Sequence, residues 1–216
     1  MEKKDITICC VKWGDKFKAD YVNKLHRGVA RHIKTHRYDF VCFTENTEGI
    51  DPEVRTAPLL CPDSYYGWWQ KLGLFQPALG AVNTERILYF DLGCVMVGDL
   101  DKVIDLQTDF AICQIYPPEL TPARYHHVYA SGAFLLKVGA HVQVWDRFNM
   151  TKATPYGDQL WIEQNAPNAM LIPHDWSPSY KLRHLKNKLP ENASWVMFHG
   201  VPKPHECGGW VKEHWI

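Results

Sequence analysis

Residues 86–100, RILYFDLGCVMVGDL, carry the clearest structural signal in this chain of 216 residues. Residues 86–90 are predicted to form a buried strand, because they are apolar, rich in aromatics and too few for a helix. The strand leads into Asp91, Gly93 and a second apolar run at 94–97. Since ligands of α/β proteins bind at the carboxyl ends of strands, Asp91 is a candidate binding residue. The alternative interpretation is a turn cap, which is the commoner role of an isolated Asp-x-Gly.

The N-terminal part of the chain has the order strand, helix, strand. Residues 6–11 and 38–43 are predicted strands, and the apolar spacing of residues 21–33 predicts the helix between them. This order is typical of a right-handed βαβ unit with parallel strands. Neither strand is followed by a glycine-rich phosphate loop, which argues against a Rossmann dehydrogenase and a P-loop enzyme.

The alternation of strands and helices continues along the chain. The length fits a single domain, residues 1–216. We therefore expect an α/β fold with a mainly parallel central sheet flanked by helices. Further strands are predicted at 110–116, 128–137 and 195–199, helices at 67–75, 142–150 and 157–164, and irregular connections at 51–66 and 117–127.

The composition is that of a globular protein, with 46% hydrophobic and 22% charged residues and a net charge of zero. This balance argues against nucleic acid as the main partner, although a basic run at 181–188 could contact phosphate as well as solvent. The seven cysteines are odd in number and lie mostly in apolar runs, so we expect free thiols. Neither a signal peptide nor a membrane-spanning run is recognisable, and the expected location is the cytoplasm.

Four polar side chains outside the 86–100 segment are further candidates. Lys71 lies in a predicted helix, where it could reach an anionic ligand or face solvent. Asp158 lies near a helix start, where the helix dipole favours an acid whatever its function. His199 ends a predicted strand and Lys203 follows between prolines, so one could bind a metal and the other a phosphate. An isolated histidine is more often structural.

In their order along the chain, these segments resemble the GT-A-fold glycosyltransferases, in particular the glycogenin-like and lipopolysaccharide galactosyltransferase-like group. The resemblance runs nearly end to end, and no single segment is decisive. Their order, with His-Gly-x-Pro-Lys-Pro near the C-terminus, makes the resemblance specific. The segments are VKWGD at 11–15, YV at 21–22, FVCFTE at 40–45, WWQKL at 68–72, LYFDLG at 88–93, SG at 131–132, GDQ at 157–159 and FHGVPKP at 198–204.

The resemblance implies a GT-A (Rossmann-like) fold with a nucleotide-binding half, residues 1–100, and an acceptor half, residues 101–216, which contains the His-Gly-x-Pro-Lys-Pro loop. It implies a nucleotide-sugar donor, usually a UDP-sugar, whose diphosphate contacts a Mn²⁺ or Mg²⁺ ion held by Asp91 and His199. Asp158 and Gln159 would lie beside the donor sugar and the acceptor as the catalytic residues. The residues implied to hold the donor are Val11, Lys12, Trp13, Gly14, Tyr21, Thr44, Glu45, Lys71, Asp91, Gly200 and Lys203.

Gly93 departs from the family pattern. The family has an Asp-x-Asp motif whose second acid is the principal metal ligand, and glycine offers no side-chain ligand there. Three outcomes are open: a weaker metal site completed by the diphosphate and water, transfer without metal that relies on Lys71 and Lys203, or donor binding without turnover. Asp99 and Asp101 lie too far along the chain to replace the missing acid.

The expected function is therefore transfer of a sugar to an acceptor, which could be a saccharide, a protein or a modified nucleic acid. By the resemblance, the enzyme is of the hexosyltransferase type and retains the anomeric configuration. In an inverting reaction, Asp158 would be the general base. The alternatives are a nucleotide-sugar-binding protein with weak or no transferase activity, and a glycosyltransferase that acts on modified nucleic acid.

Overall fold

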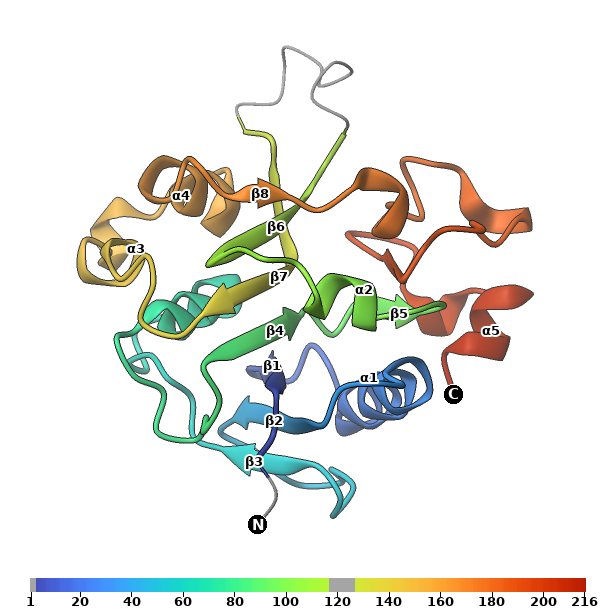
Figure 1. Cartoon of the computed structure of the whole chain (residues 1–216), viewed down its shortest axis with the longest axis horizontal. Helices are drawn as coiled ribbons and strands as arrows, with labels where there is room; N and C mark the ends of the chain where they lie inside the picture. The colour runs from blue at the N-terminus through green and yellow to red at the C-terminus, as the bar shows by residue number, and fades with distance from the viewer. Residues whose placement is uncertain (1–2, 117–126) are drawn as a thin grey trace.

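The computed structural model describes residues 3–116 and 127–216, and a seven-stranded sheet forms its centre (Figure 1). The strands lie in the order β3-β2-β1-β4-β7-β6-β8. A separate two-stranded sheet pairs β5 with β9. The strands are β1 (Ile6–Lys12), β2 (Tyr38–Thr44), β3 (Arg55–Ala57), β4 (Arg86–Phe90), β5 (Cys94–Met96), β6 (Phe110–Gln114), β7 (Tyr129–Lys137), β8 (Met170–Leu171) and β9 (Trp195–Met197).

The large sheet is mainly parallel, as predicted. Parallel pairs join β1 to β2, β1 to β4, β2 to β3 and β6 to β8, whereas β7 runs antiparallel to both β4 and β6. Because β7 runs in the opposite direction, its first residues lie beside the carboxyl end of β4, with Ala133 opposite Phe90. Two segments far apart in the sequence therefore meet where a ligand of an α/β protein is expected.

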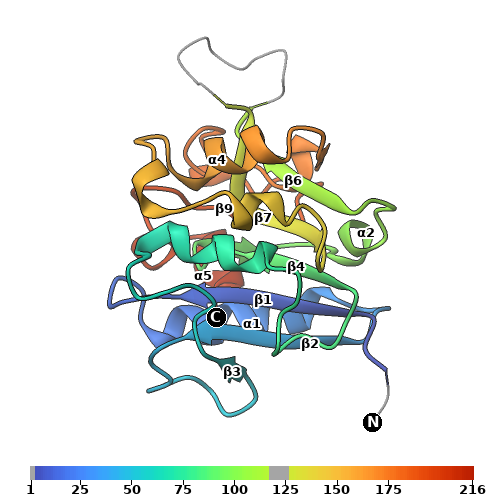
Figure 2. The ribbon, with the colours of Figure 1, turned by 90° about the vertical axis from the view of Figure 1, so that its left-hand side faces the viewer.

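Helices cover both faces of the sheet. Figure 2 shows η1, α3 and α4 on the face toward the viewer, and α1 lies on the opposite face. The α-helices are α1 (Ala19–His32), α2 (Asp101–Ile104), α3 (Gln143–Asp146), α4 (Gly157–Asn165) and α5 (Trp210–His214). The 3₁₀ turns are η1 (Gly67–Phe75), η3 (Met150–Lys152), η4 (His174–Trp176), η5 (Leu185–Asn187) and η6 (Pro204–Glu206).

Two apolar layers result, because alternate residues of a strand point to opposite faces. Ile8 and Cys10 of β1 pack in the layer that contains α1 and the β5–β9 sheet. Cys9, between them, packs in the layer that contains η1 and α4. The strands are therefore buried on both faces, which explains why their sequences are continuous apolar runs rather than alternating ones.

The structure differs from the sequence expectation in two connections. The segment 51–66 was expected to be irregular but contains β3, which pairs with β2 at the sheet edge and whose Arg55 forms an ion pair with Asp39. The helix expected at 142–150 is only α3, because the side chain of Asn149 accepts a hydrogen bond from the Thr151 N–H and starts the separate turn η3. The expected irregular connection at 117–127 falls, apart from its last residue, outside the described residues.

All seven cysteines are free thiols, as predicted, and six of them are buried. Burial raises the pKa of Cys113 to about 12, so this thiol stays protonated at neutral pH. Within residues 3–116 and 127–216, none of the helices has the length and the apolar composition needed to cross a bilayer.

Candidate active site

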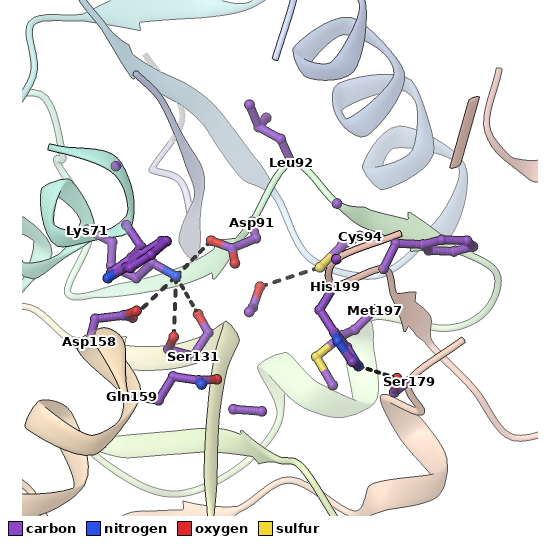
Figure 3. Close-up of a pocket in the computed structure, with 18 of the residues that line it drawn as sticks. Lys71, Asp91, Leu92, Cys94, Ser131, Asp158, Gln159, Ser179, Met197 and His199 are labelled. Atoms are coloured by element: carbon purple, nitrogen blue, oxygen red, sulfur yellow. Dashed lines mark hydrogen bonds and ion pairs between the residues drawn. The ribbon is translucent and has the colours of Figure 1, made fainter. Parts of the chain in front are cut away.

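A cavity of about 820 Å³ opens where β1 and β4 end (Figure 3). The fold brings together six parts of the chain that line it: the loop after β1, η1, the β4–β5 connection, the start of β7, the start of α4 and the loop after β9. Residues 115, 127, 179 and 182 complete the lining. The polar and charged residues among them are Lys16, Lys71, Asp91, His127, Ser131, Asp158, Gln159, Ser179, His199 and Lys203.

Lys71 projects from η1 into the cavity floor and is only 3% exposed. Its Nζ donates to Asp91 Oδ1 at 2.9 Å and to the carbonyl and Oγ oxygens of Ser131 at 3.2 and 3.3 Å. The same Nζ lies 3.4 Å from Asp158 Oδ2. Figure 3 shows these contacts converging on one nitrogen. A buried ammonium needs such partners, because burying an unpaired charge is costly.

The electrostatics of this cluster keep Lys71 charged. Burial alone would lower the pKa of the ammonium, but the carboxylates of Asp158 and Asp91 raise it above its usual value. Burial raises the pKa of Asp158, and the Lys71 charge opposes that shift. Lys71 therefore carries its proton throughout the physiological range, and its single positive charge is shared between the two carboxylates beside it.

Asp91 is held from two sides and remains open on a third. Its Oδ1 accepts a hydrogen bond from the Tyr89 hydroxyl at 2.5 Å in addition to that from Lys71, and its N–H donates to the Gly132 carbonyl at 2.8 Å. Burial and the Asp91 charge raise the pKa of Tyr89 well above its usual value, so the hydroxyl remains a donor. The Asp91 side chain is nevertheless 43% exposed toward the cavity.

Asp158 lies in the first turn of α4, and its side chain is 5% exposed. Oδ2 has no hydrogen-bond partner among the described residues, and its ion pair with Lys71 spans 3.4 Å. The preceding Gly157 has φ +76°, and a Cβ there would lie 3.3 Å from Trp68 Nε1. Glycine at this position therefore lets Trp68 pack against the start of the helix that carries Asp158.

Gly93 is buried, and there is no room for a side chain at this position. A Cβ on Gly93 would lie 2.7 Å from the carbonyl oxygen of Phe198, which is backbone. The Phe198 N–H donates to the Gly93 carbonyl at 2.9 Å, and Cys94 pairs with Met197 in the next register position. Pairing of β5 with β9 thus brings two backbones together where the expected acid is missing.

His199 and Lys203 line the opposite side of the cavity. His199 Nε2 lies 2.7 Å from Ser179 Oγ, and burial together with Lys181 and Lys203 lowers the histidine pKa, which favours the neutral ring. The Lys203 Nζ lies 5.3 Å from the centre of the Phe17 ring. Burial and the Lys16 charge lower the Lys203 pKa.

The residues implied by the family resemblance separate into two groups in the structure. Nine line the cavity: Val11, Trp13, Lys71, Asp91, Asp158, Gln159, His199, Gly200 and Lys203. Lys12, Gly14, Tyr21, Thr44 and Glu45 are not among its lining residues. The Gly14 N–H donates to Glu45 Oε1 at 2.5 Å, and the Tyr21 hydroxyl lies 2.5 Å from His205 Nδ1. A role for these five in holding the nucleoside stays a prediction.

Several lining residues had no role assigned from the sequence. Tyr89 lies two positions before Asp91, so strand alternation alone places both side chains on one face. Lys16, Trp68 and Tyr156 carry no local signal, because a lysine in a loop and an aromatic beside a helix are ordinary. Their place at the cavity depends on the fold.

Comparison with known proteins identifies the architecture. No protein-family profile and no curated protein sequence matches this chain. The glycosyltransferase GlyE of Streptococcus pneumoniae TIGR4 superposes with a TM-score of 0.70 at 12% identity over 99% of this chain and 59% of GlyE. The galactosyltransferase LgtC, solved with donor and acceptor sugar analogues, gives a TM-score of 0.65 at 11% identity over 96% of this chain and 93% of LgtC. The bifunctional glycosyltransferase WbbM gives 0.67 at 12% over 94% of this chain and 47% of WbbM.

This chain has the GT-A fold. The resemblance to GT-A glycosyltransferases seen in the sequence is thereby confirmed for the fold. The chain spans little more than half of GlyE and less than half of WbbM. At these identities the comparison supports the fold alone.

A GT-A fold implies a divalent cation beside the donor diphosphate, and the residues of this cavity do not fit one. The described residues contain no group of three or more His, Cys, Asp or Glu side chains placed to hold a metal ion. Mn²⁺ and Mg²⁺ favour several oxygen ligands, carboxylates above all. Asp91 has one oxygen engaged by Lys71 and Tyr89, and Gly93 offers none. Asp101 is engaged elsewhere, accepting hydrogen bonds from the backbone N–H groups of residues 34–36.

Proposed function

We propose that this protein is a glycosyltransferase that takes a sugar from a nucleotide-sugar donor, with a UDP-sugar as the first candidate, and attaches it to an acceptor. The observation that carries the proposal is the Lys71 cluster: a buried ammonium between Asp91 and Asp158 at the floor of a large cavity at the strand ends. Solubility and core packing do not account for such a cluster, because buried charges are costly and concentrate at functional sites.

Different lining residues of the cavity suit different parts of the donor. Lys203 and Lys16 on one side suit the phosphates, since ammonium groups bind phosphate oxygens as point charges. Asp158 and Gln159 at the start of α4 suit the hydroxyls of the donor sugar, because carboxylate and amide groups can accept and donate several hydrogen bonds. The nucleoside would then extend toward Val11 and Trp13.

In the transfer step, the bond between the anomeric carbon and the diphosphate oxygen breaks while the acceptor oxygen bonds to the same carbon. Negative charge develops on the diphosphate, where nearby ammonium groups stabilise it. Asp158 is buried and ion-paired with Lys71, which makes it a poor general base for an acceptor that arrives from solvent. This supports transfer with retention of configuration, in which the departing diphosphate takes the proton of the acceptor hydroxyl.

The rim of the cavity favours a saccharide acceptor over a protein or a nucleic acid. Trp68 and Tyr156 both line the cavity and are 52% and 45% exposed. Large aromatic side chains are usually buried, and exposed ones beside a cavity provide flat apolar surfaces on which the C–H face of a sugar ring can stack. Trp68 packs at the start of α4 and therefore borders Asp158.

The direct test is incubation of the protein with UDP-, GDP- and dTDP-sugars, with and without Mn²⁺, while nucleotide release is followed. Release should occur with one donor class and should increase when a suitable oligosaccharide is added. The product configuration is read from the anomeric proton coupling in its NMR spectrum. No release with any donor, in the presence of a panel of acceptors, would contradict the enzyme proposal.

A second candidate function is binding of a nucleotide sugar without transfer, and Gly93 is the observation that favours it. A donor site that needed an acid at this position would lose activity with glycine there, while the cavity could still bind the donor. Tight UDP binding in a calorimeter together with no release of nucleotide from any sugar donor would favour this function over transfer.

A further inference from the structure

Two lysine side chains share one aromatic ring at the entrance of the cavity. The Lys16 Nζ lies 5.6 Å and the Lys203 Nζ 5.3 Å from the centre of the Phe17 ring. Both lysines line the cavity, although they come from opposite ends of the chain. Burial lowers the pKa of Lys203 and the Lys16 charge lowers it further, while the carboxylates of Asp91 and Glu206 act in the opposite direction. The two like charges repel each other, and an anion bound between them would relieve that repulsion.

The carboxylate that would hold a metal already has its counter-ion. Asp91 Oδ1 receives hydrogen bonds from the Lys71 ammonium at 2.9 Å and from the Tyr89 hydroxyl at 2.5 Å. Because Lys71 is buried and fixed by Ser131 as well, it cannot leave without breaking several contacts. Because Lys71 also pairs with Asp158, it offsets the Asp91 charge in part, which weakens both the attraction of Asp91 for a cation and its repulsion of a phosphate.

The neighbouring positions cannot complete a metal site. A side chain at position 93 would collide with the Phe198 carbonyl, and His199 directs Nε2 to Ser179 at 2.7 Å (Figure 3). The described residues that line the cavity include three lysines, Lys16, Lys71 and Lys203, against two aspartates, Asp91 and Asp158. This leaves one net positive charge without any ion. A cation-binding site has the opposite balance, with carboxylates in excess.

We propose that the cavity binds the donor diphosphate without a divalent cation, with Lys16 and Lys203 holding its oxygens and Lys71 reducing the repulsion from Asp91. The inference rests on the proposed function, because it concerns the same donor site. It assigns Lys16, which has no role in the sequence-based expectation, to donor binding. It also explains why a glycine is compatible with the donor site: no ligand is needed at position 93.

The test is calorimetric titration of the purified protein with UDP, GDP, dTDP and inorganic pyrophosphate at constant ionic strength, once with EDTA and once with Mn²⁺. The affinity for the best of these ligands should agree within twofold between the two conditions. Tightening of tenfold or more by Mn²⁺ would overturn the proposal and leave the proposed function standing. Absence of binding in both conditions would overturn both.

Single substitutions distinguish a direct contact of each lysine with the diphosphate from a general effect of protein charge. Lys16→Met and Lys203→Met should each weaken binding in EDTA by at least tenfold, and pyrophosphate should respond as the nucleotide does. The matched control is Lys212→Met, which removes the same charge from an exposed position outside the cavity. If Lys16→Met binds as tightly as the control, Lys16 does not contact the diphosphate and the assignment is wrong. Circular dichroism of each variant verifies that the fold is intact.

Discussion

The backbones of Gly93 and Phe198 meet so closely that a Cβ on the glycine would lie 2.7 Å from the Phe198 carbonyl oxygen. The same two residues are joined by a hydrogen bond from the Phe198 N–H to the Gly93 carbonyl at 2.9 Å. The contact links the β4–β5 connection to the end of β9, and thereby sets the distance between Asp91 and the loop that carries Lys203. The residue at position 93 thus has a packing role as well as a place in a motif.

Gly93→Asp should therefore destabilise the protein instead of restoring a metal site. We expect a loss of about 1–3 kcal/mol in the free energy of unfolding, which is the usual cost of overpacking a buried position. Mn²⁺ should not raise nucleotide release in this variant above that of the parent protein. Urea denaturation and the release assay measure both effects.

Gly208→Ala is the matched control for that experiment, because a Cβ there meets nothing within 4 Å and the residue has no positive φ. It should change the free energy of unfolding by less than about 1 kcal/mol. A Gly93→Asp protein as stable as the parent, with Mn²⁺-dependent release, would show that the two backbones can separate and that the metal site is latent.

Removing the Lys71 ammonium should destabilise the fold, because Asp158 would remain buried. Lys71→Met is expected to lower the free energy of unfolding by about 3 kcal/mol, because it leaves Asp158 buried without a counter-ion. Asp158→Asn in the Lys71→Met background should recover part of that loss. A double-mutant cycle by urea denaturation should give a coupling free energy of about 1–3 kcal/mol. Additive effects would contradict an interaction between the two charges.

Asp158 should matter for transfer more than for donor binding. Its side chain lies in the cavity at the start of α4, whereas the lysine pair proposed to hold the phosphates comes from the loops after β1 and β9. Asp158→Asn keeps the shape of the side chain, and we expect the transfer rate to fall by about a hundredfold or more, whereas the Kd for UDP should change by less than about threefold. Asp109→Asn, exposed and outside the cavity, is the control. Equal losses of binding and rate would place Asp158 at the nucleotide instead.

Trp68 should contribute to the binding of the acceptor. Because the indole is 52% exposed, Trp68→Ala should cost less than about 1 kcal/mol of stability. Loss of a stacking surface should raise the KM for an oligosaccharide acceptor about tenfold, which corresponds to about 1.4 kcal/mol. Tyr66→Ala removes an equally exposed aromatic, 53%, that does not line the cavity, and should leave this KM unchanged. An unchanged KM in Trp68→Ala would show that the acceptor does not stack on Trp68.

The hydrogen bonds of Asp101 should make the free energy of unfolding depend on pH. Burial acts to raise its pKa, but hydrogen bonds from the backbone N–H groups of Lys34, Thr35 and His36 lower it below the usual value. The folded carboxyl therefore binds its proton less tightly than the unfolded one, and the stabilisation is present above about pH 4 and lost as the pH falls through the folded-state pKa. Asp101→Ala should lower the free energy of unfolding by about 2–3 kcal/mol at pH 7, with the difference from the parent narrowing at lower pH. A difference independent of pH in urea denaturation between pH 3 and pH 7 would contradict this origin.

Much of the fold could be predicted because its signals are local. The strands at β1, β2 and β4 and the helix α1 follow from apolar runs and helical spacing, and the structure has each within two residues of the expected bounds. The strand β3 could not be predicted, since three residues at a sheet edge owe their conformation to pairing with β2 and carry no periodicity of their own. The shortened α3 depends on one side chain, Asn149, that competes with the helix for a backbone N–H.

The amino-acid order thus specified the strand that ends at Asp91, the glycine at position 93 and the succession of segments that resembles a GT-A glycosyltransferase, because these depend on neighbours along the chain. The charge arrangement of the cavity has a different origin. Lys71 meets Asp91 across 20 positions and Ser131 across 60, and the lysines beside Phe17 come from opposite ends of the chain. No local pattern encodes such distances. The direction of β7 and the pairing of β5 with β9 place these groups together, so the partial neutralisation of Asp91 and the closed position 93 became visible only in the folded chain.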